Sequence, residues 1–365
     1  MLLASVSADR FRSLEEVELS PGPRSTAIFG PNGSGKTNLL EATYFGLTGR
    51  SFRTADRRDL IPFGGDYARV RVRVDGEGVE HEFMTATSRT EQTRTTLDGA
   101  RVDRGEADLH RPAVTVFSPE RLELVKGPPA VRRAHLDQFI AARWHHRADL
   151  RRDFGRTLAQ RNALLAAVSR GEASASGLQT WDAQLARAGA ALTEARSEAV
   201  ELLAPSYRDS SGSLGLVGEN QLEYRPAAAV DEEGLLAGFE ERRDRDLEAG
   251  RTTWGPQNDE LRLERDGRQL RRFGSQGQQR LGLLALLFAE RMVLAGAGNP
   301  TPLLLLDDVM SELDSTRREA LLEMLSVGGQ AIISAAEESL LPDNPDLVRI
   351  GIDELTGATS VGGQG

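Results

Sequence analysis

The stretch Gly30-Pro31-Asn32-Gly33-Ser34-Gly35-Lys36-Thr37 decides the fold of this 365-residue chain. It fits the pattern G-x-x-x-x-G-K-[ST] and stands between an apolar run, 26–29, and a helical pattern that begins at Lys36. In that context the glycines let backbone N–H groups face phosphates, and the helix N-terminus adds its positive end. We expect Lys36 to bind the β- and γ-phosphates of a nucleotide and Thr37 to offer its hydroxyl to Mg²⁺. The alternative interpretation is a glycine-rich turn without a ligand.

Lysine is rare in this chain, which makes Lys36 more informative. The sequence has 45 lysines and arginines together, and only Lys36 and Lys126 are lysines. A compact ammonium fits a phosphate loop where a broad guanidinium does not. The residue choice therefore favours the phosphate-binding interpretation.

Two adjacent carboxylates form the second candidate site. Asp307 and Asp308 follow the apolar run 303–306, which predicts a buried strand. Two like charges at a strand end are costly unless a cation neutralises them. We expect Asp307 to hold Mg²⁺ and Asp308 to orient the attacking water or accept its proton. The alternative is a solvated strand end with an aspartate that caps the next helix.

A second anion site is predicted at Ser275-Gln276-Gly277-Gln278, before the apolar helix expected at 281–294. A serine, a glycine and free N–H groups at a helix start suit an anion. One triphosphate has no obvious use for two such sites on one chain. We therefore expect two subunits to pair head to tail, each offering this site to the nucleotide held by the other.

The elements predict an α/β fold. Period-two patterns and short apolar runs predict strands at 2–8, 14–19, 26–29, 70–74, 79–84, 95–99 and 113–117. Helical patterns cover 36–47, 131–168, 178–203 up to Pro205, and 232–247, and the two long helices must return on themselves. Buried parallel strands are expected at 303–306 and 331–334. We expect an ATPase head from 1–125 and 255–365, with an N-terminal β lobe, and a helical insert domain at 126–254.

Composition restricts the function. The chain has no cysteine, which excludes disulfides and thiolate chemistry, and no segment long and apolar enough to cross a membrane, so we expect a cytoplasmic protein. A net charge of −10 argues against coating nucleic acid by bulk charge. DNA contact would need a local arginine patch, and the candidates are Arg50, Arg53, Arg57 and Arg58 in one loop. A second arginine group lies on the helix expected at 131–168, where a solvated face is the favoured interpretation: Arg132, Arg133, Arg143, Arg147, Arg151 and Arg152.

These motifs in this order resemble ABC-type ATPases, in the branch that contains RecF and the heads of structural-maintenance-of-chromosomes proteins. The closer resemblance is to the RecF family, and it spans nearly the whole chain. It rests on Phe11-Arg12, the stretch 30–42, Ser51-Phe52-Arg53, Gly255-Pro256, 275–280 and Asp307-Asp308-Val309-Met310-Ser311-Glu312-Leu313-Asp314. The short helical insert also suits this family.

The resemblance implies roles for matching residues. Ser275 and Gly277 would touch the γ-phosphate across a dimer, Asp314 would support the opposite active site, and Arg12 would lie near the nucleotide. Many ABC ATPases place a histidine after the strand that follows the carboxylates, but here Ser334-Ala335-Ala336 contains none. Asp308 is also one methylene shorter than the glutamate of faster relatives. The missing histidine leaves γ-phosphate sensing without an assigned residue, and the short Asp308 predicts slow hydrolysis of ATP with Mg²⁺, which suits a switch. The resemblance also implies that DNA stimulates this hydrolysis.

The resemblance also implies a DNA-repair function. ATP binding would close a homodimer on DNA at single-strand gaps and junctions, and hydrolysis would release it. The expected partners are DNA, RecR and RecO, with RecA loading and the SOS response as outcomes. Two alternatives stay open. One is a small-molecule P-loop kinase or transferase, which would have no use for 275–278; the other is a nucleotide-binding scaffold without DNA contact.

Overall fold

The structure is a computed structural model that describes every residue except 77, 103–106, 108–109, 297–300, 327 and 357–365. The chain divides into two compact units. Unit 1 comprises Met1–Arg121 and Leu294–Gly365, and unit 2 comprises Leu122–Val293. The predicted division into a head and an insert at 126–254 differs from these units mainly in placing Ser275 with the head. The division into a head at 1–125 and 255–365 and an insert at 126–254 stays a prediction.

Unit 1 contains a six-stranded antiparallel sheet with the order β2-β1-β4-β5-β6-β7. Alternation explains its two faces: in β4, Val70, Val72 and Val74 are buried while the arginines between them point the other way. The strands are β1 (Leu2–Phe11), β2 (Leu14–Leu19), β4 (Tyr67–Gly76), β5 (Val79–Ser88), β6 (Arg94–Leu97) and β7 (Ala100–Arg101). This sheet is the β lobe that the sequence predicts.

A five-stranded parallel sheet completes unit 1, with the order β14-β3-β13-β12-β8. Its strands are β3 (Ser25–Phe29), β8 (Val114–Phe117), β12 (Leu303–Leu306), β13 (Ala331–Ala335) and β14 (Leu347–Gly351). Both ends of the chain therefore contribute to one sheet. Because parallel strands end at the same edge, the loop after β3 and the carboxylates after β12 lie at one edge of the sheet.

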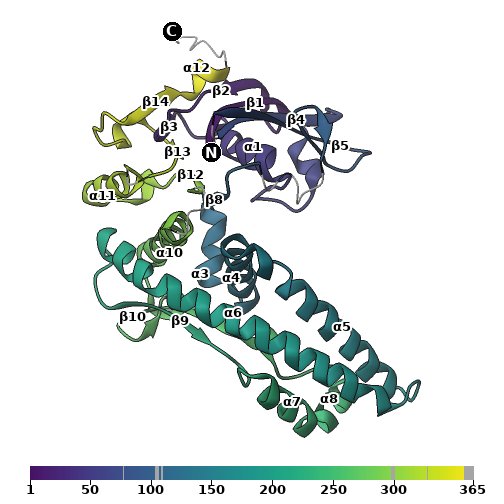
Figure 1. Cartoon of the computed structure of the whole chain (residues 1–365). Helices are drawn as coiled ribbons and strands as arrows, with labels where there is room; N and C mark the ends of the chain where they lie inside the picture. Colours follow the sequence, from purple (N-terminus) through teal and green to yellow (C-terminus); the bar gives the residue numbers. More distant parts are fainter. Residues whose placement is uncertain (77, 103–106, 108–109, 297–300, 327, 357–365) are drawn as a thin grey trace. The chain divides into compact units, whose positions relative to one another are not determined.

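Helix α1 (Lys36–Thr48) packs against strands of both sheets and belongs to the large hydrophobic core of unit 1. Gly46 permits this approach, because a Cβ there would lie 2.4 Å from the Val72 Cγ2 atom. The other helices of unit 1 are α11 (Ser315–Ser326) and α12 (Ile352–Thr356), with short 3₁₀ turns at Arg57–Leu60, Met310–Glu312 and Glu338–Leu340. In Figure 1, α1 lies directly beside β1 and β4.

Unit 2 is mainly helical, and its long helices α5 and α6 lie side by side (Figure 1). The prediction that two helices joined by a short loop return on themselves is confirmed. A small antiparallel sheet has the order β11-β10-β9, with β9 (Asn220–Arg225), β10 (Glu260–Arg265) and β11 (Arg268–Gln269). The helices are α3 (Glu123–Lys126), α4 (Pro129–Arg143), α5 (Leu150–Ser169), α6 (Leu178–Ser213), α7 (Glu232–Glu241), α8 (Arg243–Ala249), α9 (Leu270–Phe273) and α10 (Gln276–Gly296).

Three predicted helix bounds are wrong. The helix expected at 131–168 is broken at Trp144, whose backbone is extended and whose ring lies under the guanidinium groups of Arg143 and Arg147. Helix α6 does not end before Pro205 but continues to Ser213, since residues on both sides of the exposed proline are buried in the core. Helix 232–247 is two helices that meet at Arg242.

Buried ion pairs hold the helices of unit 2 together. Arg161 is fully buried, and its guanidinium donates to Asp182 on α6 and to Asp246 on α8 at 2.7 Å each. Arg196 is bound in the same way by Asp137 and Asp259. Because an unpaired buried charge is costly, these pairs fix which segments of unit 2 meet. Among the described residues, no helix combines the length and apolar character needed to cross a bilayer.

Candidate functional site

The loop between β3 and α1 has the backbone of a phosphate cradle. Gly30, Gly33 and Gly35 all have positive φ, at 151°, 83° and 102°. L-residues with a Cβ rarely adopt such angles, so the glycines of the pattern are required by the turn itself. At Gly35 a Cβ would also lie 2.9 Å from a methyl of Leu14. The loop ends at the N-terminus of α1, where the free N–H groups lie.

The Lys36 side chain reaches back across this loop. Its Nζ donates to the carbonyl oxygens of Gly30 at 2.6 Å and Pro31 at 2.8 Å, and the residue is 7% exposed. Burial lowers the pKa of the Lys36 ammonium, while Asp308 and Asp307 oppose that shift. A cation held at the centre of a glycine-rich loop, with carboxylates nearby, is suited to phosphate oxygens.

Thr37 and Asp307 lie together although 270 residues separate them in the chain. The Thr37 hydroxyl donates to the Asp307 carboxylate at 2.9 Å, and the Ser334 hydroxyl of β13 donates to it at 2.7 Å. Asp307 is 5% exposed, which rules out the solvated strand end considered above. Burial raises the pKa of Asp307, Ser334 and Thr37 lower it, and Glu120 and Asp308 raise it further. This carboxylate is thus a buried anion that a cation would stabilise.

Asp308 is held in an unusual backbone conformation. Its φ is 51°, in the left-handed region, and its N–H donates to the Ser334 hydroxyl at 2.9 Å. In the described part of the chain, its Oδ1 atom is buried without a hydrogen-bond partner, and so is the Ser34 hydroxyl in the phosphate loop. Buried polar atoms are almost always satisfied in folded proteins. These two atoms are therefore prepared for a ligand that the loop and the carboxylates share.

The donor set fits Mg²⁺ bound to a triphosphate. Mg²⁺ usually takes one or two carboxylate or hydroxyl ligands from the protein and completes its shell with phosphates and water. Thr37 and Asp307 supply such ligands. No group of three or more histidine, aspartate or glutamate side chains in the described ranges forms a metal cage. The residues therefore suit a metal brought with a nucleotide.

Glu41 organises a cluster beside this loop, and sequence reasoning missed it. Its carboxylate is fully buried on α1 and accepts from Arg12, from the Ser51 hydroxyl and from Arg53 at 3.4 Å. Arg53 also donates to Asn38 at 3.1 Å. The motifs at 11–12, 38–41 and 51–53 therefore contact one another. Only the helical position of Glu41, four residues after Thr37 and facing inward, could have indicated this.

The Ser275 segment forms a capping box at the start of α10. The Ser275 N–H donates to the Gln278 side chain at 2.8 Å, and the Gln278 N–H donates to the Ser275 hydroxyl at 3.3 Å. Ser275, Gln276 and Gly277 are exposed, and a Cβ at Gly277 would meet nothing within 4 Å. The segment is ordered and open to a ligand. It belongs to unit 2, whereas the phosphate loop belongs to unit 1.

Asp314 caps the next helix of unit 1. Its carboxylate accepts from the Arg317 N–H at 2.9 Å and from the Arg317 guanidinium at 2.9 Å. About half of the side chain is exposed, so a further contact with another molecule is sterically open. Its role toward an opposite active site stays a prediction.

Comparison with known proteins gives a consistent result. The family model for the RecF/RecN/SMC N-terminal domain matches residues 2–356. The DNA replication and repair protein RecF of Moorella thermoacetica is 38% identical over 339 residues, which cover 91% of this chain and 89% of that protein. RecF of an Anaeromyxobacter species is 39% identical and covers 93% and 94%. The chain belongs to the RecF family.

Solved structures agree with this assignment. The recombination mediator protein RecF of the RecFOR pathway, solved with ATP, has a TM-score of 0.82 at 29% identity and covers 93% of this chain and 92% of that one. A chromosome-maintenance head bound to part of ScpA has a TM-score of 0.57 at 17% identity, covering 93% and 91%. The latter supports the fold alone. The predicted α/β fold, an ABC-type head with a β lobe and a helical part, is confirmed.

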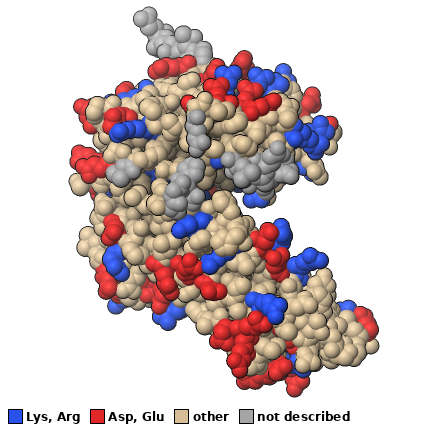
Figure 2. Space-filling view, in the orientation of Figure 1, with Lys and Arg blue, Asp and Glu red and all other residues tan. Residues whose placement is uncertain are grey.

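The four arginines of the loop line one hollow in unit 1 of this RecF-family chain. The hollow has a cavity volume of about 970 Å³, and its lining contains Asp56 and four arginines, Arg50, Arg53, Arg57 and Arg58. The Nε atom of Arg57 is buried and has no hydrogen-bond partner among the described residues. Figure 2 shows basic and acidic side chains mixed over the face drawn. We call the cavity lined by these arginines the arginine hollow.

Each arginine of the second group has a partner within unit 2. Arg132 is buried and pairs with Glu260 at 2.7 Å, and Arg147 pairs with Glu198. The others have these partners: Arg133 with the Asp259 carbonyl, Arg143 with the Trp144 ring, Arg151 with Asp137, and Arg152 with Asp149. The expectation of one solvated face is wrong for Arg132, which is part of the core.

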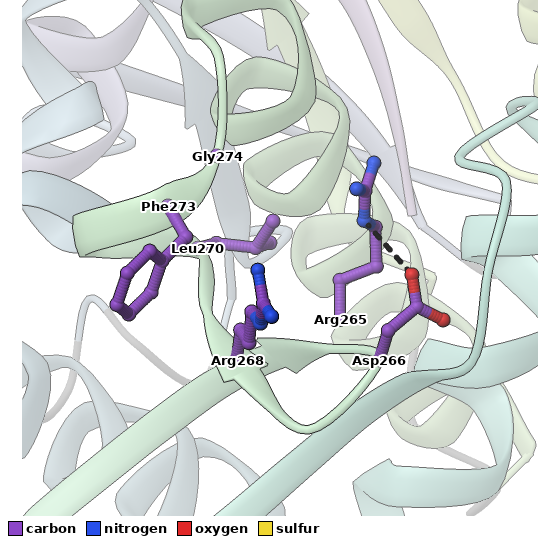
Figure 3. A pocket seen from close by; sticks show the side chains of 6 residues that line it. All are labelled: Arg265, Asp266, Arg268, Leu270, Phe273 and Gly274. Atoms are coloured by element: carbon purple, nitrogen blue, oxygen red, sulfur yellow. Dashed lines mark ion pairs between the residues drawn. The ribbon is translucent and has the colours of Figure 1, made fainter.

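A small pocket immediately precedes the Ser275 segment. Its cavity volume is about 280 Å³, and Figure 3 shows the Arg265–Asp266 ion pair on one side and Phe273 on the other. The Arg268 guanidinium lies 5.9 Å from the centre of the exposed Phe273 ring. The pocket therefore places the Arg268 guanidinium close in sequence to the start of α10.

Proposed function

We propose that this chain is an ATP-dependent switch of DNA repair that binds Mg²⁺ and ATP, pairs head to tail with a second copy, and holds DNA while paired. The contact of Thr37, Asp307 and Ser334 carries the proposal, because it joins the phosphate loop to the carboxylates. Family membership and the ATP-bound RecF relative support the choice of nucleotide.

The phosphate loop binds and orients the triphosphate. Lys36 exchanges its two carbonyl acceptors for β- and γ-phosphate oxygens. The negative phosphates stabilise the ammonium charge that burial destabilises. The Ser34 hydroxyl and the backbone N–H groups of the loop donate to the same phosphates. Gly30, Pro31, Asn32, Gly33 and Gly35 shape the cradle. Arg12, tied to Glu41, lies beside α1.

Thr37 and Asp307 would hold Mg²⁺, which would supply neutralisation of the triphosphate charge. Asp308 orients the attacking water and accepts its proton through the unpartnered Oδ1 atom. Ser334 positions both aspartates, through its hydroxyl toward Asp307 and toward the Asp308 N–H. The short Asp308 side chain and the absent histidine support slow hydrolysis, which DNA stimulates.

The Ser275 segment completes the site of a second copy. Its capping box presents Ser275, Gly277 and the first N–H groups of α10 to a γ-phosphate, with Gln276 and Gln278 beside them. Asp314 supports the same opposite site. The arginine hollow contacts DNA phosphates. By family resemblance, the paired form acts at gaps with RecR and RecO and assists RecA loading and the SOS response.

Sedimentation velocity with ATP and Mg²⁺ tests the proposal on the wild type and two variants. We expect a dimer for the wild type and a monomer for Lys36→Met, which loses the phosphate ligand. Ser275→Arg should bind ATP and stay monomeric. A wild type that stays monomeric with ATP would contradict head-to-tail pairing, and a dimeric Ser275→Arg variant would remove the role given to that serine. A small-molecule kinase has no use for the Ser275 segment, so its sedimentation would not depend on Ser275.

A further inference from the structure

Ser275 lies within a basic stretch of unit 2. Residues 265–280 contain five arginines and one aspartate, in a chain whose net charge is −10. We call this stretch the basic segment. Three of its arginines, Arg268, Arg271 and Arg272, are exposed, and no carboxylate in the described part of the chain pairs with them. Their charges are therefore open to another molecule.

The backbone keeps this surface beside the start of α10. Leu270 is buried and begins α9, a single turn that ends at Gly274. A Cβ at Gly274 would lie 2.8 Å from the Leu270 carbonyl oxygen, so the chain turns tightly there. Phe273 is left 64% exposed, with the Arg268 guanidinium 5.9 Å from the centre of its ring (Figure 3). The segment thus presents cations and one aromatic ring to solvent.

The position of the basic segment in the chain ties it to the site that Ser275 would complete. Arg272 precedes Ser275 by three residues and Arg271 by four, and four extended residues span at most about 14 Å. In the proposed pair, Ser275 reaches the γ-phosphate that the phosphate loop of the other copy holds. The arginines then lie near the edge of that loop.

The surroundings of the phosphate loop carry the opposite charge. The turn between β1 and β2 packs on the loop, since a Cβ at Gly35 would lie 2.9 Å from a methyl of Leu14. Helix α12 packs on it as well, since a Cβ at Gly30 would lie 2.6 Å from a methyl of Ile352. Exposed carboxylates follow both contacts in the chain, and we call them the acidic rim: Glu15, Glu16, Glu18, Asp353 and Glu354.

Arginines of unit 1 do not neutralise the acidic rim. The Arg12 guanidinium donates to the buried Glu41 carboxylate at 2.7 Å, and the Arg10 guanidinium lies over the Tyr67 ring, 5.2 Å from its centre. Among the described residues, no rim carboxylate forms an ion pair, and Glu354 accepts only a backbone N–H at 3.2 Å. Unit 1 thus presents uncompensated negative charge beside the loop, where unit 2 of another copy would bring positive charge.

We infer that the basic segment docks on the acidic rim of a second copy, and that this match of charges selects the head-to-tail arrangement. The inference rests on the proposed pairing and names the surfaces that make it. Two basic segments repel each other, and so do two acidic rims, so only the head-to-tail arrangement is attractive. In a symmetric pair each copy supplies both surfaces, and the contact occurs twice.

Charge reversal tests this match in the absence of DNA. Sedimentation with ATP and Mg²⁺ compares the wild type with Arg271→Glu/Arg272→Glu and with Glu15→Arg/Glu16→Arg. Each variant alone should pair about 100-fold more weakly, because a repulsion of roughly tenfold acts at both contacts. An equimolar mixture of the two variants should pair again, because every reversed surface then meets its opposite. A mixture that stays monomeric would overturn the inference.

A matched variant separates the contact from net charge. Arg187→Glu/Arg245→Glu makes the same change of charge at exposed positions of α6 and α8 and should pair like the wild type. All variants should bind a fluorescent ATP analogue at concentrations where the protein is monomeric, which shows that the nucleotide site is intact. If this variant pairs as weakly as Arg271→Glu/Arg272→Glu, net charge accounts for the loss and the inference fails.

Salt gives a second readout. The Kd of the wild-type pair should rise between about 0.05 M and 0.3 M salt, because the screening length shortens. A Kd that does not change with salt would contradict a match of charges. If Arg271→Glu/Arg272→Glu pairs normally but loses affinity for DNA, the basic segment contacts DNA and not the second copy. A wild type that stays monomeric with ATP would instead reject the proposed function, which distinguishes the two failures.

Discussion

The buried Asp307 carboxylate destabilises the folded protein when no cation is bound to it. The carboxylate is 5% exposed, and its hydrogen bonds come from the hydroxyls of Thr37 and Ser334. Burial raises its pKa, which means that the folded protein bears a cost for the ionised form at neutral pH. A residue that is needed for a cation but costs stability alone is typical of functional sites.

Asp307→Asn should therefore stabilise the ligand-free protein and weaken the nucleotide complex. We expect Tm to rise by roughly 2–4 °C, for about 1 kcal/mol, because the uncharged amide still accepts a hydrogen bond. The Mg²⁺-dependent gain in ATP affinity should disappear. Differential scanning fluorimetry with and without Mg²⁺ and ATP measures both. Asp343→Asn, an exposed carboxylate of the same unit, is the control and should change neither. A variant less stable than the wild type in both states would contradict this account.

Glu41 accepts hydrogen bonds from two arginines, Arg12 and Arg53. Glu41→Gln keeps the side-chain volume but removes the charge that Arg12 and Arg53 share. We expect a loss of about 2 kcal/mol, or a Tm lower by roughly 4–8 °C, since both guanidinium groups are partly exposed and can turn to water. Thermal unfolding measures the change in Tm. Glu18→Gln, at an exposed position of β2, is the matched control. An unchanged Tm would show that the cluster does not stabilise unit 1.

Among the helices, α6 contains Pro205 in its interior, so packing must stabilise this helix against the proline. The proline lies inside a helix of 36 residues, exposed, while Leu203 and Tyr207 on either side are buried. Its ring removes one backbone hydrogen bond, so packing on the other face must outweigh a helix penalty of about 3 kcal/mol.

Pro205→Ala should stabilise the chain by about 1–3 kcal/mol, because the exposed position loses no packing and the helix regains its hydrogen bond. Denaturant unfolding followed by tryptophan fluorescence measures this change in unit 2. If the helix ended before residue 205, the substitution would leave stability unchanged or lower it, since proline also restricts the unfolded chain.

Elements and motifs differ in how well the sequence predicts them. Patterns of a few residues predict the turn of the phosphate loop, the buried strand before Asp307 and the antiparallel strands. The structure has these elements at the expected positions. Trp144 and Pro205 show the limit of such patterns. The helix ends at Trp144 although the helical pattern continues, and α6 continues through Pro205, whose neighbours Leu203 and Tyr207 are buried. The role of Ser334 could not be assigned in advance, and that of Glu41 only from its helical position, because both depend on contacts between distant segments.

On the scale of the whole molecule, the sites divide between the two units. The phosphate loop belongs to unit 1, and all three tryptophans belong to unit 2 together with the Ser275 segment. Tryptophan emission during heating therefore reports unit 2, while any stabilisation by nucleotide within one copy begins in unit 1.

ATP with Mg²⁺ should raise the tryptophan-monitored transition in a way that depends on protein concentration, because a second copy must bring its nucleotide to Ser275. At [ATP] of 100 times Kd, stabilisation of about 2.7 kcal/mol is available to the binding unit. Ser275→Arg should lose the concentration dependence and keep the unit 1 effect seen by circular dichroism. A tryptophan transition that shifts equally at all concentrations would argue against pairing.

The parallel sheet has a consequence for synthesis. Its central strands β13 and β12 come from the end of the chain, whereas β3 and β8 are made early. At 5–20 residues per second, the ribosome needs roughly 10–40 s between finishing β8 and starting β12. During that interval unit 2 is made completely, while the apolar strands β3 and β8 lack the strands that pair with them. Asp307 is made directly after β12. A nascent chain therefore cannot hold metal and nucleotide together until most of unit 1 has been made.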